Sequence, residues 1–185
     1  MSLLSMEEVK QGLDKEFLPL EPMLTGLRLI EGGVTETALD AFERDMNLLL
    51  PRAFRDVIRM HDFGRLTIGP VAFCNTGDYL GELVKLNTKV TWWGTGMRPS
   101  SLLMVANSDP FAILLDLESG SVLAMDVERG WQFAERVASS FDLFVRGVGS
   151  TMLHRNQSAD RVALGRDVMS DAGGGYLPYW LQLAK

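Results

Sequence analysis

The sequence is poor in the side chains on which disulfides, metal sites and catalytic motifs depend. It holds a single cysteine, Cys74, which excludes an internal disulfide, and two histidines, His61 and His154, which do not form a His-x-x-x-His metal pair. It also lacks the Gly-Lys-Ser/Thr ending of a phosphate-binding loop and the Gly-x-Ser-x-Gly turn of a hydrolase serine. We therefore expect a non-enzymatic protein with no metal and no other cofactor.

Long apolar runs are missing as well. No stretch reaches the roughly 18 consecutive apolar residues of a membrane-spanning helix. Leu3 and Leu4 are followed by acidic residues too soon for the core of a signal peptide. A single cysteine suits a reducing compartment. These features together predict a cytoplasmic protein with no membrane segment.

Acidic residues outnumber basic residues in this chain. It carries 18 Lys and Arg residues against 24 Asp and Glu residues, a net charge of −6. A nucleic-acid-binding domain needs a basic face, so we do not expect a nucleic-acid partner. The acidic balance is compatible with a basic protein partner, because complementary charges speed encounter. It is equally compatible with solubility alone.

The side chains that could act in catalysis have simpler interpretations. His61 lies on or beside the apolar face of a predicted helix, which favours packing over general-base catalysis. His154 lies among polar residues, and the neighbours of Cys74 include no base. We expect a surface histidine and a small buried thiol, respectively.

Helices are predicted in the first third of the chain from their end signals. A capping box predicts one helix over residues 6–17, and a threonine N-cap predicts another over 36–47. A third amphipathic helix begins at Pro51, whose missing N–H is tolerated in a first turn, and is expected to end at a left-handed cap on Gly64.

After Gly64 the pattern changes to short apolar segments separated by turns. Asn75 or Thr76 is expected to cap a helix, and Ser139 to open another that Gly147 and Gly149 close. Strands are predicted over 66–68, 71–73, 102–106, 112–116 and 122–127, with one more extended piece starting at Trp131 and Phe133. This order predicts an α+β fold with a mostly antiparallel sheet of about five to six strands and helices packed on one side.

Several short motifs resemble the SUKH immunity superfamily, which includes the fungal Smi/Knr-type regulators of cell-wall synthesis. Their order and spacing carry the resemblance, which covers residues 34–149. The motifs are Thr35-Glu36, Phe42-Glu43, Leu50-Pro51 with Phe54, His61-Asp62-Phe63-Gly64, the strand 103–106, Gly120-Ser121-Val122, and Ala138-Ser139-Ser140-Phe141 with Phe144. The chain departs from the family where Asp62-Phe63-Gly64 replaces Asn-Gly-Gly, and where Asn107-Ser108-Asp109-Pro110-Phe111 replaces a turn rich in Gly and Asp.

The resemblance divides the chain into three parts. Residues 1–33 are an N-terminal helix and linker, 34–149 are the Smi/Knr-like domain, and 150–185 are a C-terminal tail. The aromatic residues of the tail, 176–181, are expected to dock on the domain, because an exposed cluster of this kind would be a liability or a binding site.

The resemblance implies a cytoplasmic immunity protein that binds and neutralises a cognate bacterial toxin, often a nuclease, delivered by a neighbouring cell. The fungal relatives imply an alternative, a general regulatory scaffold for protein interactions. A less favoured alternative is a small-molecule-binding enzyme with a pocket near His61, Asp62 and the Trp92-Trp93 loop. The residues that we expect to contact a protein partner are Asp62, Phe63, Trp92, Trp93, Asp109 and Trp131.

Overall fold

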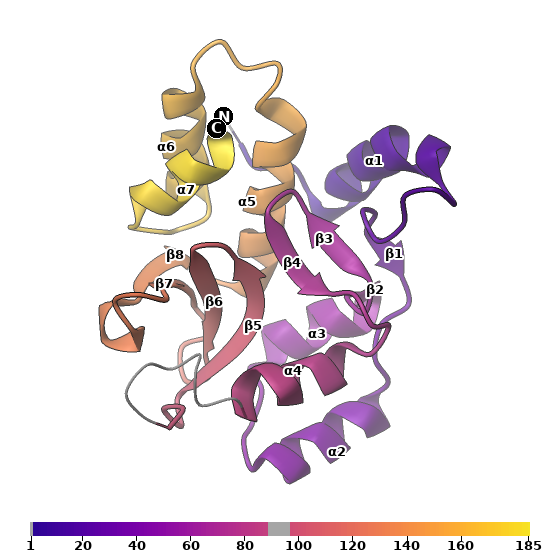
Figure 1. Ribbon diagram of the computed structural model, residues 1–185, viewed down its shortest axis with the longest axis vertical. Helices are drawn as coiled ribbons and strands as arrows, with labels where there is room; N and C mark the ends of the chain where they lie inside the picture. The colour runs from indigo at the N-terminus through magenta and orange to yellow at the C-terminus, as the bar shows by residue number, and fades with distance from the viewer. Residues whose placement is uncertain (1, 89–96) are drawn as a thin grey trace.

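The computed structural model describes residues 2–88 and 97–185, and these form the α+β fold that the sequence predicts. Six antiparallel strands make one sheet in chain order, and a second sheet pairs β1 (Ile30–Glu31) with β2 (His61–Asp62), as Figure 1 shows. The six are β3 (Leu66–Ile68), β4 (Val71–Cys74), β5 (Leu102–Ser108), β6 (Phe111–Asp116), β7 (Val122–Asp126) and β8 (Glu135–Ala138).

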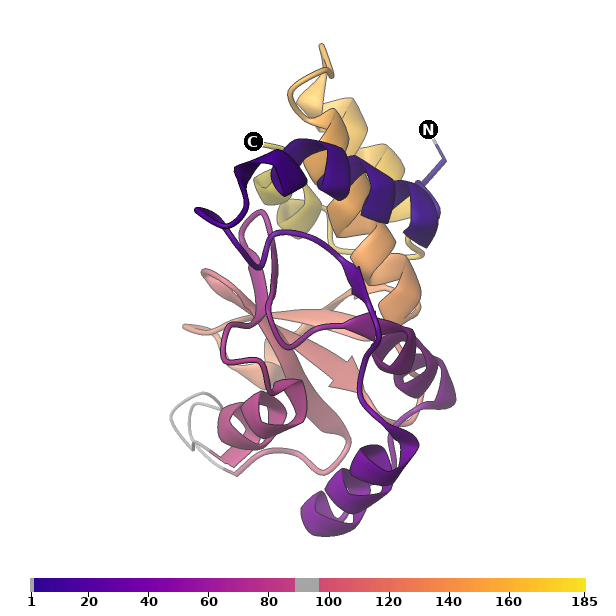
Figure 2. The same cartoon turned by 90° about the vertical axis from the view of Figure 1, so that its right-hand side faces the viewer.

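Helices precede, interrupt and follow the strands. Along the described chain they are α1 (Met6–Phe17), η1 (Leu18–Leu20), α2 (Glu36–Met46), α3 (Arg52–Met60), α4 (Tyr79–Thr88), η3 (Trp131–Phe133), α5 (Phe141–His154), α6 (Arg161–Asp171) and α7 (Leu177–Ala184). Figure 2 shows α1 crossing α5 at the top of the molecule. Within residues 2–88 and 97–185, no helix is both long and apolar enough to cross a lipid bilayer.

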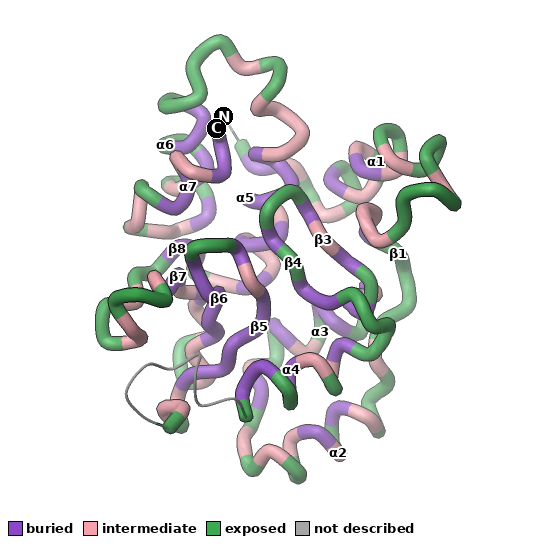
Figure 3. The backbone as a smooth tube through the Cα atoms, in the orientation of Figure 1, coloured by how far each residue is buried: buried purple, intermediate pink, exposed green. Residues whose placement is uncertain are grey.

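The six-stranded sheet is covered by apolar side chains on both faces. Because side chains alternate along a strand, Leu103 and Val105 of β5 join the main core against the helices, while Leu102 and Met104 join a smaller cluster with Leu86 of α4. Figure 3 shows the resulting burial along β5 and β6. The prediction that the 102–106 strand is buried on both faces is confirmed.

The capping predictions for α1 and α2 are confirmed. Ser5 and Glu8 make a reciprocal capping box, and the Thr35 side chain accepts a hydrogen bond from the Ala38 nitrogen at 3.2 Å. Such local signals determine a helix start because they satisfy backbone N–H groups that have no partner within the helix.

The predicted end of α3 is wrong. The helix stops at Met60, and His61 is extended, pairing with Glu31 of β1. Gly64 is not a left-handed cap. Its nitrogen donates to Asp62 Oδ1 at 2.7 Å, and a Cβ at this position would lie 2.7 Å from the carbonyl oxygen of Gly77. A glycine is needed here because two segments of backbone approach closely.

Two other local predictions are corrected near helix starts. Asp78, rather than Asn75 or Thr76, accepts from the Gly81 nitrogen at the start of α4, at 2.9 Å. Trp131 and Phe133 form the short helix η3 instead of an extended piece.

The prediction for α5 is wrong at both ends. Ser140 caps the helix in place of Ser139, and the helix continues through Gly147 and Gly149 to His154. These glycines are sites of close helix packing. A Cβ at Gly149 would collide with Val9 of α1, and a Cβ at Gly147 would lie 2.6 Å from Cη2 of Trp180.

The aromatic end of the chain is buried. Tyr179 and Trp180 of α7 are fully inaccessible, and the Trp180 indole donates to the Val137 carbonyl of β8 at 3.1 Å. Helix α5 runs without interruption across residues 149 and 150, the predicted boundary between the Smi/Knr-like domain and the C-terminal tail. The residues after 150 therefore share one core with the sheet.

Strands β4 and β5 pair only at Ala72 and Asn107, and helix α4 fills the place where they diverge. The Asn87 side chain accepts from the Met104 nitrogen at 2.7 Å and donates to the Met104 oxygen at 2.9 Å. The Tyr79 hydroxyl donates to the Val105 oxygen at 2.9 Å. Two side chains of α4 thus satisfy backbone groups of β5 that a neighbouring strand would otherwise bind.

Candidate functional site

The structure does not gather the predicted partner-binding residues on one surface. Phe63 is only 1% exposed, and its ring packs against Phe73, Tyr79 and Phe141 in the core. It cannot contact a partner in this conformation, so this prediction is corrected. Asp62 is half-buried in the two-stranded sheet and binds the Gly64 nitrogen.

Two other predicted contacts, Asp109 and Trp131, border the six-stranded sheet. Asp109 is exposed in the turn between β5 and β6, where its carbonyl oxygen accepts from Gln182 at 3.0 Å. Trp131 is half-buried and packs against the smaller apolar cluster. Trp92 and Trp93 lie outside the described residues.

A concentrated charged surface is found instead on α2. Glu36, Asp40 and Glu43 are spaced so that they share one side of the helix, and we call them the acidic face. All three bind the guanidinium group of Arg55 on α3, with an Asp40 Oδ1 to Nη2 distance of 2.9 Å. Arg59 adds a second cation, 2.9 Å from Glu36.

The three carboxylates bind the guanidinium groups of Arg55 and Arg59, and Arg44 lines the depression beside Asp40 and Glu43. Hydrogen bonds from Arg55 to Asp40, and then to Glu43 and Glu36, raise the pKa of the arginine above its ordinary value and keep it charged. Glu36 and Asp40 are at least half exposed, whereas Glu43 is nearly buried. The two exposed carboxylates are therefore fixed in position but still accessible to a partner.

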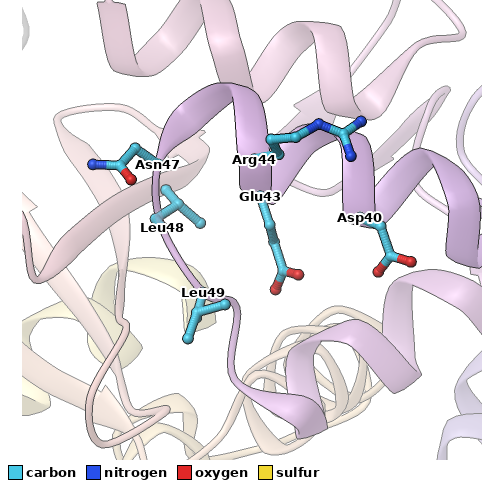
Figure 4. A pocket seen from close by; sticks show the side chains of 6 residues that line it. All are labelled: Asp40, Glu43, Arg44, Asn47, Leu48 and Leu49. Atoms are coloured by element: carbon cyan, nitrogen blue, oxygen red, sulfur yellow. The ribbon is translucent and has the colours of Figure 1, made fainter.

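The same face borders a shallow open depression of about 410 Å³. Figure 4 shows Asp40 and Glu43 pointing to the same side of α2, with Leu49 beyond them on the link to α3. Glu43 also accepts from the Leu50 nitrogen at 2.7 Å, which fixes the end of that link, next to α3. Leu49 is 79% exposed, so the depression combines the charged side chains of Asp40, Glu43 and Arg44 with an unburied apolar side chain.

This link begins where α2 ends in a left-handed residue. Asn47 has φ of 49°, a conformation that asparagine tolerates better than most residues. The nitrogen of Leu48 then bonds to the Glu43 oxygen at 3.0 Å. The turn is thus held by backbone bonds, and it presents Leu49 to solvent.

The groups with catalytic potential are less accessible. His61 is a buried residue whose Nδ1 has no hydrogen-bond partner, and burial lowers its pKa. The Cys74 thiol is buried and donates to the Asp78 oxygen at 3.6 Å. Among residues 2–88 and 97–185, no three His, Cys, Asp or Glu side chains are placed to hold a metal ion together.

No protein-family model matches this sequence, and no curated protein matches it either. The resemblance to the SUKH superfamily therefore stays a prediction.

The sequence contains a signal for the acidic face that the predicted contacts did not include. Acidic residues at 36, 40 and 43 follow helical spacing, on a side of the helix next to the buried Leu39 and Phe42. The contribution of Arg55 depends on how α3 folds back on α2, and no local pattern in the sequence gives that arrangement.

Proposed function

We propose that this protein binds a basic protein partner through the acidic face and Leu49, and that it acts as an immunity protein that neutralises a toxin. The acidic face beside the exposed Leu49 carries this proposal. The resemblance of residues 34–149 to immunity proteins supports it further.

The shape of the site favours a macromolecule over a small ligand. Small-molecule sites are usually concave and enclose most of their ligand, whereas this depression is open. Carboxylates that are already positioned by Arg55 lose little conformational freedom when a partner binds. An exposed leucine beside them can enter an apolar pocket on the partner, while the charges direct the encounter.

The direct test is protection in living cells. The toxin encoded next to this protein's gene is expressed with the wild-type protein, with a Glu36→Gln/Asp40→Asn variant, and with Leu49→Asn. We expect wild-type protein to restore growth and both variants to protect less. Glu135→Gln removes an exposed carboxylate on β8 and serves as the control.

Three results would count against the proposal. Toxicity that wild-type protein does not reduce would remove the immunity function. Protection that persists in both variants would show that the partner binds elsewhere. Loss of protection with Glu135→Gln as well would indicate a general dependence on net charge, contrary to a defined site.

A further inference from the structure

A buried histidine lies where the N-terminal segment of the chain meets the rest of the protein. His61 follows α3 and pairs with Glu31, so it belongs to the small sheet that joins β1 to β2. This sheet is separate from the six-stranded one, and each of its strands is two residues long. Figure 1 shows it at the side of the molecule, below α1. His61 is nevertheless only 9% exposed.

The backbone is packed tightly around this histidine. Just after β1, the Gly32 nitrogen donates to the Met60 oxygen at 3.0 Å. A Cβ on Gly33 would lie 1.9 Å from the Ile58 oxygen and 2.7 Å from the His61 oxygen. The chain that follows β1 therefore lies directly against the end of α3 and the start of β2.

The imidazole ring of His61 fits this place only while it is neutral. Its Nδ1 atom is buried and has no hydrogen-bond partner within residues 2–88 and 97–185. A neutral ring carries a hydrogen on one nitrogen, whereas a protonated ring carries a hydrogen on both. Protonation would therefore bury a charged N–H group that has no acceptor, which is unfavourable.

The charged side chains around the ring compensate little for that burial. Those that act on it are Glu31 of β1, Glu7 and Lys10 of α1, and Asp142 of α5. Lys10 lies 3.9 Å from Glu31, whose side chain is 76% exposed, and Arg146 binds Asp142 at 3.2 Å. Burial outweighs the attraction of the carboxylates, so the pKa of His61 lies below its ordinary value.

We propose that protonation of His61 separates β1 from β2, so that mild acid loosens the N-terminal segment while the six-stranded sheet stays folded. Separation gives water access to both ring nitrogens, which the charged ring requires. The tight contact at Gly33 means that β1 has to move before β2 can turn the ring outward. This inference goes beyond the proposed function, because no residue of the acidic face takes part in it.

Hydrogen exchange followed by NMR tests the opening at the Gly32 and Gly33 amides, after correction for the intrinsic exchange rate at each pH. The open form takes up a proton with the ordinary histidine pKa of 6.5, so each pH unit below that value favours opening by up to about tenfold. We expect protection of both amides to fall about tenfold between about pH 7.5 and 5.5. Low concentrations of urea should leave it unchanged, because a local opening exposes little surface.

The two histidines of the chain supply a matched pair of variants. His61→Gln removes the titrating group, so the pH dependence of protection at Gly32 and Gly33 should disappear. His154→Gln should behave as wild type, since Nδ1 of His154 already has a partner, the Ser150 oxygen at 2.9 Å. Each variant is compared with its own protection at neutral pH, so a constant loss of stability does not affect the result.

Three results would overturn the proposal. Unchanged protection in wild type across this pH range would show that the protonated ring is accommodated without opening. An equal fall in His61→Gln would assign the pH dependence to another group. Exchange at Gly32 and Gly33 that rises with urea in step with the amides of β6 would show global unfolding in place of a local opening.

Discussion

Replacing Asn87 by alanine should destabilise the protein by leaving backbone groups of β5 without partners. Asn87 lies within a buried region and makes three hydrogen bonds, two with Met104 of β5 and one with the Leu83 oxygen at 2.8 Å. Met104 is fully buried, so water cannot replace the lost partners without opening the structure. The variant therefore leaves a buried backbone nitrogen and a buried oxygen unpaired.

The expected cost follows from these two orphaned groups. A buried donor or acceptor without a partner costs about 1–3 kcal/mol, so the pair on Met104 should reduce the free energy of unfolding by about 3 kcal/mol. Asn87→Asp should not rescue it, because a carboxylate cannot donate to the Met104 oxygen. Asn75→Ala is the control, since Asn75 is exposed and the expected change there is within about 0.5 kcal/mol.

Urea unfolding followed by circular dichroism measures the difference directly. Hydrogen exchange adds a local readout, because the Met104 amide should exchange faster in the variant while the amides of β7 remain protected. A loss below about 1 kcal/mol, or one equal to that of Asn75→Ala, would refute the claim that α4 replaces a strand beside β5.

Three further predictions concern packing and pH. Gly149→Ala should lower stability by about 2 kcal/mol through its collision with Val9, and Val9→Ala should recover part of that loss in the double variant, as thermal unfolding can measure. Trp180→Phe should lower the free energy of unfolding in urea by about 2 kcal/mol, because it leaves a cavity and an unpaired Val137 oxygen. An unchanged urea midpoint would contradict the burial of the tail. Burial lowers the pKa of His61 below 6.5, so the unfolded chain gains a proton at a higher pH than the folded one. Stability should therefore decline as the pH falls below 6.5, and His61→Gln should show a smaller decline between about pH 7 and 5.

The starts of α1 and α2 could be predicted from the sequence because their signals are local. The capping box at Ser5 and the N-cap at Thr35 bind backbone groups three residues away. The strands of the sheet could be predicted for the same reason, since each is a short apolar run bounded by turn residues.

Errors arose where distant contacts decide the structure. In the sequence Gly147 and Gly149 look like the end of a helix. In the structure they lie inside α5, where only a glycine leaves room for Trp180 of α7 and Val9 of α1, respectively. Gly64 is likewise a glycine because the backbone of Gly77 lies too close to leave room for a side chain.

The candidate site was less predictable than the fold. Loop aromatics and turn carboxylates gave a plausible set of contacts, yet Phe63 completes the core. The acidic face depends on Arg55, which is 19 residues from Glu36 and reaches it only after α2 and α3 have folded together. Packing between helices, rather than any motif, creates that surface.

The central claim is that the acidic face holds a basic protein partner. Titration calorimetry between the purified protein and the product of the gene next to its own tests it most directly, at low and at high salt. The account predicts binding that weakens as salt is raised and falls about tenfold or more in Glu36→Gln/Asp40→Asn, with Glu135→Gln unchanged. Absence of binding, or an affinity that neither salt nor the double variant alters, would contradict it.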